Sequence, residues 1–174
     1  IGKKPIIIPQ EVEVKIDGRK VTVKGPKGEI SKEFRPEIKI EIKEGKIFVI
    51  PQKETKKTHG LQQKKIKSFW GLTRMLIANI IEGVTVGFEK KLEIEGIGFK
   101  AEISEEELVL YVGFSHPVKL KIPKEIKILL DKKNIIVSGI DKELVGQFAA
   151  TIKKVKVPEP YKGKGIKYMG EKIR

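Results

Sequence analysis

Hydrophobic side chains alternate with charged or polar ones along the first part of the chain, which is typical of antiparallel strands with one buried face. The alternating segments contain Val12, Val14 and Ile16, then Val21 and Val23, then Ile38, Ile40 and Ile42, then Ile47 and Val49. Asp17-Gly18 and Glu44-Gly45 separate neighbouring segments, and these residue types suit the positive φ of tight turns. We therefore expect hairpins in this part of the chain.

The hydrophobic period lengthens after about Lys53 to the spacing of an amphipathic helix. The residues on the apolar face of this helix are Ile66, Phe69, Trp70, Leu76, Ile77, Ile80, Ile81 and Val84. The opposite face carries Lys64, Lys65, Lys67 and Arg74, which we interpret as solvated, with nucleic-acid contact as the alternative. The pattern predicts one long helix.

Alternation resumes after a connector from Gly83 to Gly87 and predicts a second set of strands. Their inward residues are Leu92 and Ile94; Phe99, Ala101 and Ile103; Leu108, Leu110 and Val112; Val118, Leu120 and Ile122; and, in a hairpin, Ile126, Ile128, Leu130, Ile135 and Val137. Asp141 is suited to cap a helix whose inner face is Leu144, Val145, Phe148, Ala149, Ile152 and Val155. Each half therefore contains several strands followed by one helix.

These elements predict an α+β fold with two similar domains, each an antiparallel β-sheet with one α-helix packed across a face, plus an extended basic C-terminal tail. A chain of 174 residues with 39% hydrophobic content is long enough for two small cores. We expect an N-terminal domain at 1–82, a C-terminal domain at 83–157 and a tail at 158–174.

The two halves share sequence as well as element order. Ile8 to Gly25 aligns without gaps on Ile122 to Gly139 at an offset of 114 residues, with six identical pairs that include Pro9 with Pro123 and Asp17 with Asp131. This similarity favours an internal duplication, although two unrelated hairpins rich in Ile and Val could produce part of it.

Positive charge is concentrated unevenly. The whole chain has a formal net charge of +14, and Lys153 to Arg174 contains eight basic and two acidic residues, whereas Gly87 to Ile152 contains ten basic and eleven acidic ones. With Pro158, Tyr161 and several glycines in the same segment, this composition predicts a tail that becomes ordered on an anionic partner, with nucleic acid as the favoured partner.

No arrangement of residues predicts catalysis or a cofactor. Gly96-Ile97-Gly98-Phe99-Lys100-Ala101 matches a dinucleotide-binding pattern, but an alternating strand follows it where a phosphate-binding helix is required. Glu105-Glu106-Glu107 is best interpreted as a solvated turn. His59 and His116 lack a second ligand at metal-binding spacing, so no metal site is expected.

Cysteine is absent, no apolar run approaches the roughly 18 residues of a membrane span, and the first residues lack an apolar signal core. We therefore expect a cytoplasmic protein with no membrane partner and no small-molecule substrate.

Two loops carry groups that suit RNA: the basic tail and Gly113-Phe114-Ser115-His116-Pro117. Cationic groups attract phosphate, and aromatic rings stack on unpaired bases or pack against ribose. Phe114, at the end of a predicted strand, is interpreted first as an ordinary core residue. Gly163 and Gly165 would let the backbone approach a phosphate closely.

The segment from Pro158 to Ile166 resembles the signature of the bacterial ribosomal large-subunit protein six family, and the resemblance extends over essentially the full length. It includes Gly2-Lys3-Lys4-Pro5-Ile6, Gly25-Pro26-Lys27-Gly28, Gly71-Leu72-Thr73-Arg74, Gly87 to Ile94, Ser115-His116-Pro117 and Gly139 to Lys142. Trp70 departs from the family, which more often has His at this position. The chain is also expected to begin and end a few residues short of family members.

This resemblance implies a structural, non-enzymatic constituent of the large ribosomal subunit that binds large-subunit ribosomal RNA through its second domain and tail. It implies a position near the sarcin-ricin loop and the base of the factor-binding stalk, with neighbouring ribosomal proteins as partners. It also implies RNA contact at Tyr161, Lys162, Gly163, Lys164, Gly165, Lys167, Tyr168, Ser115 and His116. From charge alone we add Lys90, Lys91, Lys153, Lys154 and Lys156.

Two other functions remain open at this point. A generic basic nucleic-acid chaperone or DNA-coating protein would bind duplex DNA as tightly as ribosomal RNA. An oxidoreductase would bind a nicotinamide cofactor saturably.

Overall fold

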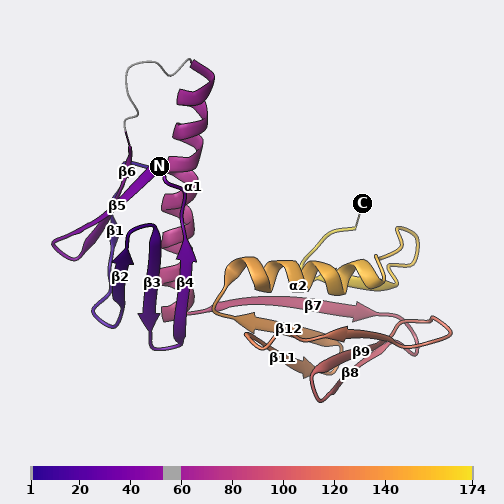
Figure 1. The fold of residues 1–174 in the computed structure, drawn as a ribbon. Coiled ribbons are helices and arrows are strands. Elements are labelled where there is room, and N and C mark those ends of the chain that lie inside the picture. The colour runs from indigo at the N-terminus through magenta and orange to yellow at the C-terminus, as the bar shows by residue number, and fades with distance from the viewer. Residues whose placement is uncertain (1, 53–59, 174) are drawn as a thin grey trace. The chain divides into compact units, whose positions relative to one another are not determined.

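The computed structural model describes residues 2–52 and 60–173, and it divides into two compact units, Ile1–Val86 and Gly87–Arg174 (Figure 1). The division follows the first helix, α1 (Gly60–Thr85), so the expected boundary between residues 82 and 83 would fall within that helix. The basic tail belongs to unit 2.

Unit 1 packs α1 against two three-stranded antiparallel sheets, where a single sheet was expected. One sheet has the order β1-β6-β5 and the other the order β2-β3-β4. The strands are β1 (Ile6–Ile7), β2 (Glu13–Asp17), β3 (Lys20–Gly25), β4 (Gly28–Glu33), β5 (Ile38–Lys43) and β6 (Lys46–Pro51). Val21, Val23, Ile47, Ile77 and Val84 are fully buried at the centre of this unit. The predicted apolar face of α1 therefore lies on the core.

Unit 2 combines α2 (Lys142–Val155) with a four-stranded sheet of order β11-β12-β7-β13 and a three-stranded sheet of order β10-β9-β8. The strands are β7 (Phe88–Glu95), β8 (Lys100–Ser104), β9 (Glu107–Tyr111), β10 (Val118–Lys121), β11 (Ile126–Asp131), β12 (Asn134–Gly139) and β13 (Gly165–Tyr168). Side chains from both sheets and from α2 form one hydrophobic core. The predicted cap of α2 is confirmed, because the Asp141 side chain accepts a hydrogen bond of 2.9 Å from the Glu143 amide.

The aligned segments of the two halves form hairpins with the same strand register. Val14 pairs with Val23 in the first hairpin, and Ile128 pairs with Val137 in the second, at the same offset of 114. Before each hairpin, a backbone amide donates to the carbonyl of the equivalent proline, Pro9 or Pro123. A third strand pairs antiparallel with the second hairpin strand in both units, β4 in unit 1 and β7 in unit 2. This agreement supports an internal duplication over two unrelated hairpins.

A glycine closes each hairpin against the helix of its unit. A Cβ atom on Gly25 would lie 2.8 Å from the Val84 carbonyl oxygen, and one on Gly139 would lie 2.9 Å from a Val145 methyl group and 3.1 Å from the Glu125 carbonyl oxygen. The duplicated glycine is therefore required where the helix approaches the hairpin most closely.

Neither helix among the described residues combines the length and the apolar character that crossing a bilayer requires.

We expect Gly139→Ala to lower the free energy of unfolding of unit 2 by about 1–3 kcal/mol, because the added methyl group overpacks the contact between hairpin and helix. Gly146→Ala is the matched control, since a Cβ at this position in α2 meets nothing within 4 Å. It should raise stability by about 0.5–1 kcal/mol through helix propensity. Urea denaturation followed by circular dichroism measures both, and equal effects of the two substitutions would contradict the packing role of Gly139.

Candidate nucleic-acid interface

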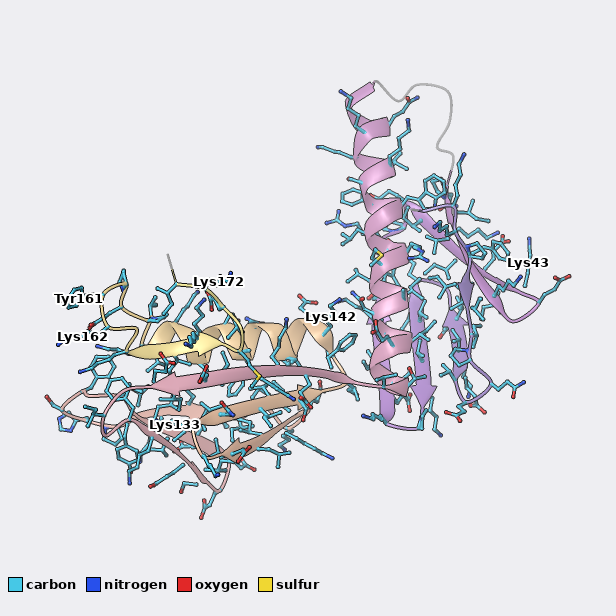
Figure 2. The ribbon with its side chains drawn as sticks, turned by 180° about the vertical axis from the view of Figure 1, so that it is seen from behind. Lys43, Lys133, Lys142, Tyr161, Lys162 and Lys172 are labelled. Carbon is cyan, nitrogen blue, oxygen red and sulfur yellow. The ribbon has the colours of Figure 1, made fainter. Side chains whose placement is uncertain are left out.

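The C-terminal segment is folded onto unit 2, which corrects the expectation of an extended tail that becomes ordered only on an anion. Strand β13 pairs antiparallel with β7 and forms one edge of the four-stranded sheet (the yellow arrow in Figure 2). Ile166 is fully buried in the core, and its amide donates a 2.8 Å hydrogen bond to the Lys156 carbonyl oxygen. The burial of one isoleucine, worth about 1.5–3 kcal/mol, therefore anchors the segment without RNA.

The two tail glycines face the protein's own chain. At Gly165, with φ of +148°, a Cβ would lie 2.6 Å from the Pro158 Cα atom and 2.9 Å from the Lys156 carbonyl oxygen. At Gly163, with φ of +67°, a Cβ would lie 3.3 Å from a Glu95 carboxylate oxygen. Close packing within unit 2 is thus sufficient to explain Gly165, and the positive φ is sufficient to explain Gly163.

Between these anchors the chain forms a closed loop from Glu159 to Lys164. The Glu159 amide donates to the Lys164 carbonyl oxygen at 3.1 Å, and the Gly163 amide donates to the Glu159 carbonyl oxygen at 2.9 Å. Tyr161 lies at the tip with 91% of its surface exposed, and Lys162 beside it is also exposed. Figure 2 shows both side chains at the end of unit 2 opposite Lys142, which lies at the start of α2. We call residues 159–164 the tail loop.

Lys167 is directed along the sheet toward two glutamates. Its ammonium lies 2.8 Å from a Glu95 carboxylate oxygen and 3.8 Å from one of Glu93, and its side chain is only 17% exposed. The hydrogen bond to Glu95 raises the pKa of Lys167 above its ordinary value. This lysine therefore clips β13 to β7 by a cross-strand ion pair.

Two of the lysines that we selected from charge alone lie near the ring of Tyr168. The ammonium of Lys153 lies 5.0 Å from the Tyr168 ring centroid and that of Lys90 lies 6.0 Å from it. Lys153 also forms an ion pair with Glu171, whose carboxylate accepts a hydrogen bond from the Tyr168 amide at 3.1 Å. The Lys153 hydrogen bond, followed by that from Tyr168, lowers the pKa of Glu171 below its ordinary value.

Lys156, at the end of α2, joins the tail to the loop between β9 and β10. While its carbonyl holds Ile166, its ammonium lies 5.2 Å from the centroid of the Phe114 ring. Ser115 and His116 follow on the same loop and are exposed. The expectation that Phe114 is a core residue is wrong, because its side chain is 51% exposed.

The remaining two lysines selected by charge differ in their surroundings. Lys154 is exposed on the last turn of α2. Lys91 forms an ion pair of 3.2 Å with Glu89 on its own strand. The structure therefore brings Lys153, Lys154 and Lys156 together with the tail at the end of α2, and gives Lys91 an acidic neighbour.

The dinucleotide-like glycines lead into strand β8, as expected, and not into a helix. Within residues 2–52 and 60–173, no group of three or more His, Cys, Asp or Glu side chains is placed to hold a metal ion. His59 lies outside the described residues.

The acidic partners Glu93, Glu95 and Glu171 were not identified from the sequence. Glu93 and Glu95 alternate along β7, which places both on one face, but nothing in their spacing indicates that a lysine more than seventy residues later pairs with them. Glu171 is one of two acidic residues in a basic segment, and its position in the sequence does not indicate which lysine it pairs with.

Fold and surface together define an α+β protein of two related units, with lysines and exposed aromatic rings gathered at one end of the second. A model of the family described as ribosomal protein L6 matches residues 8–87 and 95–169. The large ribosomal subunit protein uL6 of Carboxydothermus hydrogenoformans is 52% identical over 175 residues, covering 100% of this chain and 92% of that protein. The protein of the same name from Dictyoglomus turgidum is 51% identical over 176 residues, covering 100% of this chain and 93% of its own length. The chain therefore belongs to the ribosomal protein L6 family.

We expect the C-terminal end of the tail to loosen in acid. Because docking lowers the pKa of Glu171, its stabilising contribution is complete above the ordinary carboxyl value of 4.5 and is lost as the pH falls through the lowered value. The amide proton resonance of Tyr168 should therefore titrate below about pH 4.5. The same resonance should stay flat in Glu171→Gln, and a titration that survives this substitution would assign the effect to another group.

Proposed function

We propose that this chain is a structural constituent of the large ribosomal subunit that binds large-subunit ribosomal RNA through unit 2. Membership of the ribosomal protein L6 family and relatives that carry the name of a large-subunit protein support this function. The proposal places the protein in the cytoplasm, with neighbouring ribosomal proteins as further partners and no catalytic role.

The observation that carries the RNA-binding assignment is the tail loop, which is ordered by the protein itself and presents Tyr161 and Lys162 to solvent. A loop that is already closed loses little conformational freedom on binding, so more of the phosphate attraction is available for affinity. Lys162, Lys164 and Lys154 supply cations that release counterions from the RNA, and Tyr161 supplies a ring for stacking or ribose contact. Exposed Ser115 and His116 extend this surface.

Within the same proposal, the residues of the tail divide into two roles. Lys167 holds the tail in place through its ion pairs with Glu95 and Glu93. Gly163 and Gly165 have no side chain that would collide with Glu95 or Pro158. Tyr168, Lys90 and Lys153 form a cluster whose lysines offer charge beside a ring, with Lys153 partly neutralised by Glu171. We place direct phosphate contact mainly at the exposed Lys162 and the half-buried Lys164 of the tail loop, and at the exposed Lys154 on the last turn of α2.

The family resemblance leads us to propose a finer location, near the sarcin-ricin loop and the base of the factor-binding stalk. A hydroxyl-radical footprint of the protein on large-subunit RNA would test it, since protection elsewhere would contradict this location.

We expect Lys162→Gln with Lys164→Gln to weaken binding to a large-subunit ribosomal RNA transcript by roughly ten- to a hundredfold at moderate salt. The slope of log affinity against log salt should become shallower by about 1.4–1.8, because two phosphate contacts are removed. Fluorescence anisotropy at several salt concentrations measures both quantities. Removing the whole tail is a poorer test, because it would also remove Ile166 from the core.

The matched control is Lys39→Gln with Lys43→Gln in unit 1, which removes the same charge from two lysines that both pair with Glu41. Equal losses from the two double variants would contradict a specific role for the tail loop. Duplex DNA that competes as well as ribosomal RNA would instead favour a general DNA-coating protein.

A further inference from the structure

Phe114 is an aromatic residue whose exposure the packing of unit 2 does not explain. Phe99 and Phe148 pack in or against the core, whereas Phe114 is 51% exposed on the loop between β9 and β10. Its exposure has a backbone cause. Leu108, Leu110 and Val112 alternate inward, which would turn Phe114 inward as well, but Gly113 adopts φ of +79° and breaks the phase.

The conformation of Gly113 is one that favours glycine. A Cβ at this position would lie 3.1 Å from the Phe99 ring, in a backbone conformation that other residues rarely adopt. The outward position of Phe114 is therefore built into the loop.

The surroundings of the ring are cationic and polar. The Lys156 ammonium lies 5.2 Å from the ring centroid, Ser115 and His116 are exposed on the same loop, and Lys154 is exposed two residues before Lys156. We name Phe114, Ser115, His116 and Lys156 the Phe114 shelf. Because the Lys156 carbonyl also accepts a hydrogen bond from the Ile166 amide, the backbone of this shelf residue lies where the folded tail is anchored.

We propose that the Phe114 shelf is a stacking site for one unpaired base of ribosomal RNA. This inference rests on the proposed RNA-binding function and adds the kind of RNA element that the surface takes: a bulged or looped nucleotide beside the phosphate contacts of the tail loop. An aromatic ring stacks on the exposed face of any base, whereas a paired base within a helix offers no such face.

Lys156 supplies the shelf with a cation for the phosphate next to the stacked base. Its ammonium is carried on a flexible four-carbon chain, so it can move from the ring to the phosphate next to the stacked nucleotide. The ring is then released to the base while the cation remains close to the RNA. A protein partner would require a larger apolar surface than one half-exposed ring, and the neighbouring cations and imidazole favour a polyanion.

The test compares Phe114→Leu with Phe114→Trp on a large-subunit RNA transcript. Leucine keeps an apolar side chain but removes the ring, so affinity should fall by about 5- to 100-fold with the salt slope unchanged. Tryptophan should retain or improve affinity. Lys156→Met removes one phosphate contact, so, unlike Phe114→Leu, it should make the salt slope shallower by about 0.7–0.9. Ile97→Ala, at another exposed apolar residue of unit 2, is the control and should change neither quantity.

Chemical probing gives the direct readout. Dimethyl sulfate and a carbodiimide together report unpaired bases of all four kinds, and the wild-type protein should protect one such base that becomes reactive again with Phe114→Leu. The hydroxyl-radical footprint of the backbone should remain. Absence of a protected unpaired base, or protection that survives Phe114→Leu, would overturn the stacking site, as would unchanged RNA affinity of that variant. Failure of the proposed function is distinct, because the wild-type protein would then bind ribosomal RNA no better than duplex DNA.

Discussion

The pairing of strand β13 with β7 is the interaction on which the candidate interface depends. It buries Ile166, brings the tail back to the Lys156 carbonyl and closes the loop from Glu159 to Lys164 between two fixed points. The Lys156 ammonium lies over the Phe114 ring, so a second loop lies beside the same anchor. Main-chain pairing and one apolar contact determine the geometry of this basic surface. The backbone that carries its lysines is therefore ordered before an anion binds.

Formal charge overstates what the tail can offer to a polyanion. Lys167 is held by Glu95 and Glu93, and Lys153 is held by Glu171, so two of the basic residues work largely within the protein. The outward part is a smaller set of lysines with Tyr161. A smaller, preordered set binds with less loss of conformational freedom than a longer flexible one. Such a preordered surface can recognise the shape of an RNA more readily than a flexible polycation can.

The sequence was sufficient for the hairpins, the helices and the α2 cap, because alternation, helical spacing and an N-cap aspartate are local signals that burial reinforces. It did not reveal that each unit has two sheets, since alternation identifies a buried face and not the partner strand. Strand β13 was missed because it contains one aliphatic residue, Ile166, and its partner strand lies some seventy residues earlier. Phe114 was misplaced because Gly113 changes the phase of a pattern that otherwise continues.

Gly165 shows how the fold can imitate a functional constraint. Its missing side chain leaves space for the backbone of Pro158 and Lys156, so the position is restricted by the protein's own chain. Substitution of Gly165 would therefore disturb the folding of unit 2 even when no ribosome is present. In a family comparison or a mutational scan, invariance of the glycines and of the flanking prolines thus cannot be equated with RNA recognition. Substitutions that test RNA recognition are best made at residues that do not pack within unit 2, chiefly Tyr161 and Lys162.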